Sequence, residues 1–306
     1  MSWLFFSIAT ALLWGAAALF YKKGALPNDK YSHLKICVCV GAVMGAHAIY
    51  TLLTKDINYN PINLINYLPV SLLYIVSMAF SYFGMRFLEE SISAPIENAS
   101  GAICSLLCVS ILKESLTPLS AIAILIIVIG VLGVGFLENK GDTVRKKHLG
   151  KKLAIIAFCM PFVYALLDAF GSFVYIFFLD DFATTPLIDV TEATIEDVAN
   201  TSYELTFALF ALGLFIFMKA KKVKFGPIPQ HKDKILAAVF ETAGQFTYVY
   251  ALSGNGAIAA PIISSVCIVS LLLSRIFLKE KLSWKTYAFI TVVIVGILLL
   301  AVSEEL

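Results

Sequence analysis

The chain has 306 residues, of which 59% are hydrophobic and only 14% are charged, and its formal net charge is +2. Soluble globular domains are usually about one-quarter charged, so this composition excludes a protein whose whole surface faces water. The small net charge gives no electrostatic basis for binding nucleic acid. We therefore expect an integral membrane protein whose outer surface contacts the lipid bilayer.

The first apolar run, residues 3–21, is long enough to cross a membrane. No basic residue precedes it, and Lys22 and Lys23 follow it. This is the reverse of the order in a secretory signal peptide. We interpret the run as a transmembrane helix.

Nine more apolar runs follow, separated by charged residues, prolines and glycines that favour helix ends. A membrane-spanning helix needs about 20 mostly apolar residues, and each run is close to that length. We therefore predict an all-α membrane protein with ten transmembrane helices, at about residues 3–21, 33–53, 64–88, 93–112, 118–137, 152–179, 203–219, 234–252, 257–278 and 284–302.

Only one predicted connection is long. It covers about residues 180–202 and carries six acidic residues. Charge runs of this kind are usually solvated, so we interpret it as a loop, with a short surface helix as the alternative.

Two segments of the chain repeat each other without a gap. Residues 94–117 and residues 260–283 both begin with Ala-Pro-Ile and both close with Leu-Lys-Glu-x-Leu and a hydroxyl residue. The segments are 166 positions apart, and Tyr82 and Tyr248 share this offset. A match of this length predicts that the chain consists of two related halves.

The two predicted halves are residues 1–139 and residues 140–306, and each contains five predicted helices. Because five is odd, the second half would enter the membrane in the opposite orientation to the first. Inverted repeats around a central site are typical of secondary transporters. We therefore predict a single transmembrane domain built from two inverted five-helix repeats.

Ten helices in two inverted halves resemble the drug/metabolite transporter superfamily, in its EamA-type branch. The likeness is carried by Leu13-Trp14-Gly15 in the first helix and by the fourth and ninth helices. Both of these open with proline and end in Lys-Glu-x-Leu. The resemblance implies a ten-helix transporter of small molecules, and the sequence gives no sign of a cofactor. Members export amino acids, nucleobases, drugs and other metabolites, and some import, so the cargo stays open.

Basic residues are concentrated in the connections after the first, third, fifth, seventh and ninth predicted helices. Cytoplasmic loops carry an excess of Lys and Arg, so the charge pattern predicts that both termini lie outside the cytoplasm. The EamA-type resemblance implies termini inside, and here we follow the charge pattern. We expect a multi-pass protein of a bacterial plasma membrane.

Three carboxyl groups lie inside predicted membrane helices, those of Glu97, Asp168 and Glu241. Ionisable groups are costly at such positions and are functional by default. No Lys or Arg is predicted at the same depth, so the interior suits a cation or a proton. The three residues are candidates for substrate binding and for proton coupling. For Glu97, near the start of its helix, stabilisation by the helix dipole is the structural alternative.

Several other side chains share helix faces with these carboxyl groups. Glu241, Gln245 and Tyr248 are spaced i, i+4 and i+7 and lie on one face, and Tyr164 precedes Asp168 by one turn. Such faces can bind a polar solute, or they can be hydrogen-bonded only for packing. The candidate substrate-binding residues are Glu241, Gln245, Tyr248, Asp168, Tyr164, Glu97, Trp14 and Tyr82.

The aromatic members of this set could surround an amine through cation–π contacts, although packing is the alternative role. Pro95 and Pro261 occupy equivalent repeat positions and are candidate hinges. His47 is isolated in its helix, and we interpret it as packed or hydrogen-bonded.

The sequence contains no Ser/His/Asp set, no His-Glu-x-x-His motif and no nucleotide-binding loop. We therefore expect neither an enzyme nor an ATP-driven pump, and no metal site. The predicted function is secondary transport of a small cationic or amphipathic metabolite or drug by alternating access, with proton antiport and export favoured. An importer of a choline-like nutrient is the alternative. A non-transporting sensor or scaffold is supported only by the acidic connection.

Overall fold

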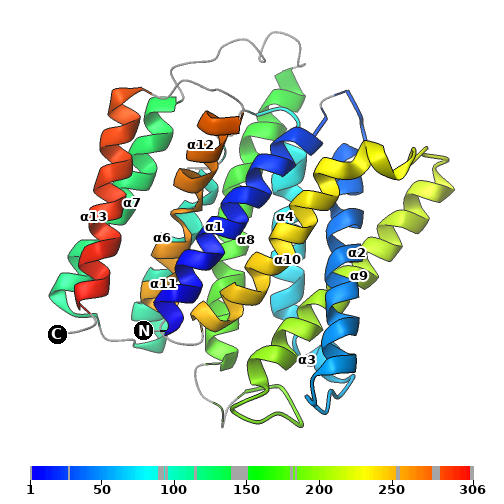
Figure 1. The fold of residues 1–306 in the computed structure, drawn as a ribbon, viewed down its shortest axis with the longest axis horizontal. Helices are drawn as coiled ribbons and strands as arrows, with labels where there is room; N and C mark the ends of the chain where they lie inside the picture. The colour runs from blue at the N-terminus through cyan, green and yellow to red at the C-terminus, as the bar shows by residue number, and fades with distance from the viewer. Residues whose placement is uncertain are drawn as a thin grey trace.

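Helices make up the structure of the chain, a computed structural model that describes residues 2–26, 28–88, 93, 96–113, 116–138, 151–179, 182, 185–252, 256–277 and 283–303. No β-strand occurs within these ranges. The helices run side by side across one layer-like bundle (Figure 1). The prediction of an all-α fold is therefore confirmed for the described part of the chain.

Each of the ten predicted runs contains at least one helix of the structure. The bounds are α1 (Ser2–Gly24), α2 (Ser32–Thr54), α3 (Asn63–Asn66), α4 (Leu68–Gly84), α6 (Ala99–Leu107), the π-helix η1 (Cys108–Leu112), α7 (Pro118–Glu138), α8 (Lys151–Leu179), α9 (Ile195–Ala220), the 3-10 helix η3 (Ile228–His231), α10 (Lys232–Leu252), α11 (Gly256–Ile263), α12 (Val266–Phe277) and α13 (Trp284–Ser303).

Six helical segments of the described residues are long and apolar enough to cross a membrane. Four more apolar helices are shorter. Large apolar side chains such as Phe5, Leu53 and Phe277 are more than 60% exposed, which is stable against lipid but costly against water. The chain is therefore a multi-pass integral membrane protein. The count of ten crossings stays a prediction.

The predicted acidic loop is partly wrong, because α9 begins at Ile195 and not at residue 203. Ile195, Val198 and Ala199 are buried at helical spacing. Glu196 and Asp197 lie in the first turn, where the positive end of the helix dipole stabilises acidic side chains. Residues 195–202 are thus two turns of a buried helix, and neither a loop nor a separate surface helix.

Four helix pairs make the most extensive contacts in the bundle: α1 with α10, α2 with α9, α4 with α8, and α7 with α13. Each pair takes one helix from residues 1–139 and one from residues 140–306. In Figure 1, α7 and α13 lie at one edge of the bundle and α2 and α9 at the other. The two predicted halves therefore interleave along their whole length and do not fold as separate domains.

The two ends of the bundle carry opposite charges. One end, here called the lysine-rich end, holds Lys22 and Lys23 in the last turn of α1 and residues 219–224 at the end of α9 and just beyond it. The other, called the acidic end, holds residues 189–197 at the start of α9. The start of α1 and the end of α13 both lie at the acidic end (Figure 1). Which end faces the cytoplasm stays a prediction.

The fourth and ninth predicted helices are both interrupted. A turn at Asn98 precedes α6, and a turn at Ser264 and Ser265 separates α11 from α12. The Ser265 amide donates to the Ile262 carbonyl, only three residues back, at 3.0 Å. Asn98 and Ser264 are 166 positions apart, so the interruptions fall at equivalent positions of the predicted repeat.

Candidate functional site: a cavity lined by carboxyl groups

All eight side chains predicted to bind substrate line a single cavity between the helices. Its volume is about 150 Å³, measured over the positions that the centre of a water molecule can reach. A water molecule needs about 10 to 15 Å³ in this measure, so the space suits a small solute. The eight residues come from α1, α4, the segment before α6, α8 and α10.

The predicted face of α10 points into the cavity. Glu241, Gln245 and Tyr248 are 8%, 5% and 4% exposed. Helix α1 lies close against this face, because Gly244 has no side chain and a Cβ atom there would lie 2.3 Å from Trp14 Cδ1. Trp14 Nε1 donates to the Glu241 carbonyl at 3.3 Å, and the Trp14 and Tyr248 ring centroids are 4.9 Å apart.

Asp168 lines the cavity from α8. The hydroxyl groups of Ser100 and Tyr164 are next to its carboxyl group. Tyr164 also lies within electrostatic range of Glu97 and Glu241, so the three predicted carboxyl groups surround the same space. They would repel one another if all were ionised, and a bound cation or proton relieves this repulsion.

Glu97 completes the set from the segment before α6. Its Oε2 accepts a hydrogen bond from Ser81 Oγ on α4 at 3.0 Å. Pro95, one of the two predicted hinges, lies outside the described residues. The other, Pro261, lies inside α11, three residues before the turn at Ser264.

Tyrosines of the cavity include three that the sequence did not single out, Tyr21, Tyr74 and Tyr203. The Tyr82 hydroxyl donates to the Tyr21 hydroxyl at 2.8 Å. A signal for Tyr74 was present, since Tyr74, Met78, Ser81 and Tyr82 are spaced i, i+4, i+7 and i+8, which places them on one helix face. That face of α4 lines the cavity.

No lysine or arginine is among the described residues that line the cavity. The walls combine carboxyl groups with the faces of Trp14 and several tyrosines. Such walls attract cations through charge and through aromatic quadrupoles. Within the described ranges no three His, Cys, Asp or Glu side chains lie in a metal-binding group.

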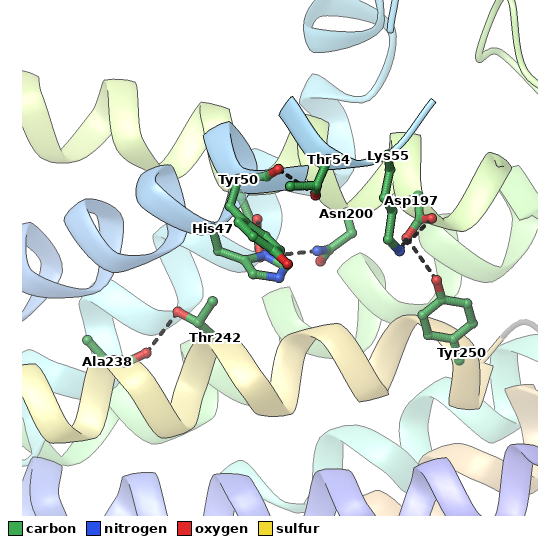
Figure 2. A network of polar contacts seen from close by, with 10 residues as sticks. His47, Tyr50, Thr54, Lys55, Asp197, Asn200, Ala238, Thr242 and Tyr250 are labelled. Carbon is green, nitrogen blue, oxygen red and sulfur yellow. Dashed lines mark hydrogen bonds and ion pairs between the residues drawn. The ribbon is translucent and has the colours of Figure 1, made fainter. Parts of the chain in front are cut away.

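A second polar cluster lies outside the cavity, between α2, α9 and α10 (Figure 2). His47 Nδ1 lies 2.8 Å from the Glu204 carboxylate, and Asn200 Nδ2 donates to Glu204 at 3.1 Å. Glu204 is fully buried. The expectation that His47 is hydrogen-bonded is therefore confirmed. Glu204 was missed because the predicted helix began at residue 203, which put this carboxyl group at a membrane surface.

The sequence matches the EamA-like transporter family over residues 1–136 and residues 183–302. The chain belongs to the EamA-like transporter family. Membership agrees with the drug/metabolite transporter resemblance and implies a small-molecule substrate. The comparison with curated proteins finds no match.

One known crystal structure of a protein superposes on this EamA-like transporter with a TM-score of 0.70. The two sequences are 12% identical, and the superposition covers 99% of this chain and 98% of the other. At this identity the likeness shows a shared fold and nothing about cargo.

Proposed function

We propose that this EamA-like transporter moves a small organic cation across the membrane in exchange for protons. The observation that supports this proposal is the composition of the cavity. Glu97, Asp168 and Glu241 line it together with aromatic side chains, and the described lining residues include no lysine or arginine. An ionised carboxylate inside an apolar bundle is costly, so Asp168 and Glu241 favour either a proton or a positively charged ligand.

The same observation supplies a coupling mechanism. Asp168 and Glu241 lie within electrostatic range of each other, so a cation bound between them and a proton bound to either one compete. Competition for one site prevents both from crossing together, which is the requirement for antiport. Where protons flow into the cell, antiport drives the cation out, so this mechanism favours export.

Inverted repeats would let one fold open this cavity to either side in turn. Two features support them. A two-fold relation between the halves would match α1 with α8 and α10 with α4. The contact between α1 and α10 would then match the contact between α8 and α4, and both contacts are present. The same relation would exchange α2 with α9 and α7 with α13, so each of these two packed pairs would be matched with itself. Corresponding helices such as α1 and α8 also run in opposite directions (Figure 1).

Transport in lipid vesicles tests this function. A permanently charged probe such as radiolabelled choline is needed, because neutral amines cross bilayers unaided and accumulate in acidic vesicles. An acidic vesicle interior should accelerate choline uptake by the wild-type protein. Glu241→Gln and Asp168→Asn should abolish this acceleration. Uptake that ignores the pH gradient and survives both substitutions would rule out proton antiport.

A second candidate is an importer of a choline-like nutrient, favoured by the aromatic walls. Trp14 and Tyr248 pack with centroids 4.9 Å apart, and Tyr21 and Tyr82 with centroids 4.6 Å apart. Aromatic faces are well suited to quaternary ammonium groups. Growth rescue of a choline auxotroph would favour import, whereas increased tolerance to a toxic quaternary amine would favour export.

A further inference from the structure

The cavity ends, toward the acidic end of the bundle, at three hydroxyl groups. Tyr74, Ser172 and Tyr248 are the cavity-lining residues nearest the acidic end on α4, α8 and α10. In the other direction the lining continues beyond the end of α4 to Met85 and Ser93. The cavity therefore has a floor on the acidic side and extends toward the lysine-rich side.

Hydrogen bonds join the three hydroxyl groups of this floor. The Tyr74 and Tyr248 hydroxyl oxygens are 2.5 Å apart. Ser172 Oγ lies 2.8 Å from the Tyr248 hydroxyl and accepts a hydrogen bond from the Tyr74 hydroxyl at 3.1 Å. Tyr74 belongs to the first predicted half and the other two residues to the second, so both bonds of Tyr74 connect the halves.

A second layer lies between the floor and the acidic end. Tyr175 is 1% exposed, and its hydroxyl donates to the Val249 carbonyl at 2.9 Å. Its ring lies against Tyr248, with centroids 5.8 Å apart, and edge-on to Tyr67 at 6.4 Å. This packing fills the space directly beyond the floor.

The outermost layer is an ion pair with a tyrosine. Lys55, at the end of α2, donates to Asp197 of α9 at 2.7 Å, and the Tyr250 hydroxyl of α10 donates to the same carboxylate at 2.8 Å. Figure 2 shows the Lys55 and Tyr250 side chains converging on Asp197 from two helices. Lys55 belongs to the first half, so this contact also connects the halves.

We propose that these layers form the gate that closes the cavity at the acidic end, and that Tyr74 and the Lys55–Asp197 pair hold it shut. The proposal assumes alternating access but no particular cargo. Hydroxyl groups that separate can bind water instead, so each bond contributes little net free energy. The Lys55 side chain is 38% exposed, which also weakens its ion pair. Contacts of this kind can break repeatedly during a transport cycle.

The repeat predicts a weaker gate at the lysine-rich end. At the offset of 166, Tyr248 corresponds to Tyr82 and Tyr74 corresponds to Phe240. Phe240 has no hydroxyl group and stacks on Phe20, with centroids 5.7 Å apart. A hydroxyl pair equivalent to Tyr74–Tyr248 therefore cannot form there. This asymmetry makes the state closed at the acidic end the resting state.

Substitutions that remove a single hydroxyl group test whether these contacts act as a gate or only as packing. Tyr74→Phe deletes both hydroxyl bonds between the halves in the inner layer, whereas the matched variant Tyr82→Phe deletes a hydroxyl bond within the first half, to Tyr21. Hydrogen–deuterium exchange of the full-length protein in lipid vesicles reports the opening of each segment. Tyr74→Phe should raise exchange in residues 68–78 and 245–252 by about tenfold, the change expected for one to two hydrogen bonds. An equal rise in Tyr82→Phe would overturn the assignment.

Chemical closure of the outer layer provides the second test. A water-soluble carbodiimide joins an amine directly to a carboxylate in contact with it, so it can link Lys55 to Asp197. Lys55→Arg keeps the charge but cannot form this amide, and it controls for reaction elsewhere. The linked wild-type protein should exchange more slowly at the acidic ends of α4, α8 and α10 than the treated variant.

Two results would contradict the gate: absence of the linked Lys55–Asp197 peptide from the folded wild-type protein, and equal exchange in the linked protein and in treated Lys55→Arg. Neither readout uses a cargo. Failure of choline transport would therefore count against the proposed function and leave the gate standing, and failure of these tests would do the reverse.

Discussion

Two groups of carboxyl side chains lie between helices of this protein, and their neighbours differ. In the cluster between α2 and α9, Glu204 lies against His47 and Asp197 against Lys55. In the cavity, Asp168 has the hydroxyl groups of Ser100 and Tyr164 beside it. A carboxylate whose cation is supplied by the fold contributes to holding helices together, whereas one with neutral neighbours leaves its charge for a ligand. We therefore propose a structural role for the first region and a transport role for the second.

Loss of the buried acid in the α2–α9 cluster should have the largest effect on stability. Glu204→Ala leaves His47 and Asn200 without their acceptor inside the bundle. Breaking a buried pair in this way costs about 3 to 5 kcal/mol, and the thermal unfolding midpoint of the purified protein would fall accordingly. Asp168→Asn should leave the midpoint almost unchanged. A stable Glu204→Ala protein would remove the structural half of the comparison.

Loss of the outer ion pair should have a smaller effect. Asp197→Asn removes the charge that Lys55 contacts, but the side chain of Lys55 is 38% exposed. Exposed pairs contribute less than about 1 kcal/mol. If Asp197→Asn lowered the thermal unfolding midpoint as much as Glu204→Ala, the pair would not behave as a surface ion pair.

The smallest effect concerns Asp29, in the connection between α1 and α2. Burial raises the pKa of this carboxyl group, but hydrogen bonds from Lys35 and from the Tyr31 amide outweigh burial and hold the pKa below its ordinary value. The stability it contributes is therefore complete above the pKa of the unfolded chain and is lost as the pH falls through the lower folded value.

Acid unfolding curves of the wild-type protein and Asp29→Asn test this pairing. Below about pH 4, where aspartate begins to protonate, the wild-type protein should lose at most a few tenths of a kcal/mol more than the variant. Equal acid sensitivity in both proteins would mean that the Lys35 contact contributes nothing.

Hydrophobic periodicity was sufficient to predict most of the helices and the cavity faces of α8 and α10. Polar side chains inside apolar helices must face the interior of a bundle, so Glu241, Gln245 and Asp168 could be placed from their spacing alone. Their convergence on one cavity agrees with the same rule, because several helices direct polar side chains into it.

Partners on distant helices could not be predicted in this way. The first turns of α9 were not predicted, because Glu196 and Asp197 interrupt the apolar pattern in the sequence although Ile195, Val198 and Ala199 are buried. That error moved Glu204 to a helix end and hid its pairing with His47, 157 positions earlier in the chain. The spacing of Tyr74 on its helix face was visible, but its contact with Tyr248 could not be predicted, because only the fold brings α4 near α10.

The binding of small cations to matched carboxylate variants tests the central claim most directly. Dissociation constants for choline, methylammonium and putrescine are measured by titration calorimetry on the wild-type protein, Glu241→Gln, Asp168→Asn and Glu204→Gln. At least one cation should bind, and either cavity substitution should weaken it by about tenfold or more, equivalent to about 1.4 kcal/mol. Glu204→Gln, which keeps a hydrogen-bond acceptor for His47, should change the constant by less than about twofold, or about 0.4 kcal/mol. Equal weakening by all three substitutions, or none by the cavity pair, would contradict the division between a structural and a transporting set of carboxyl groups.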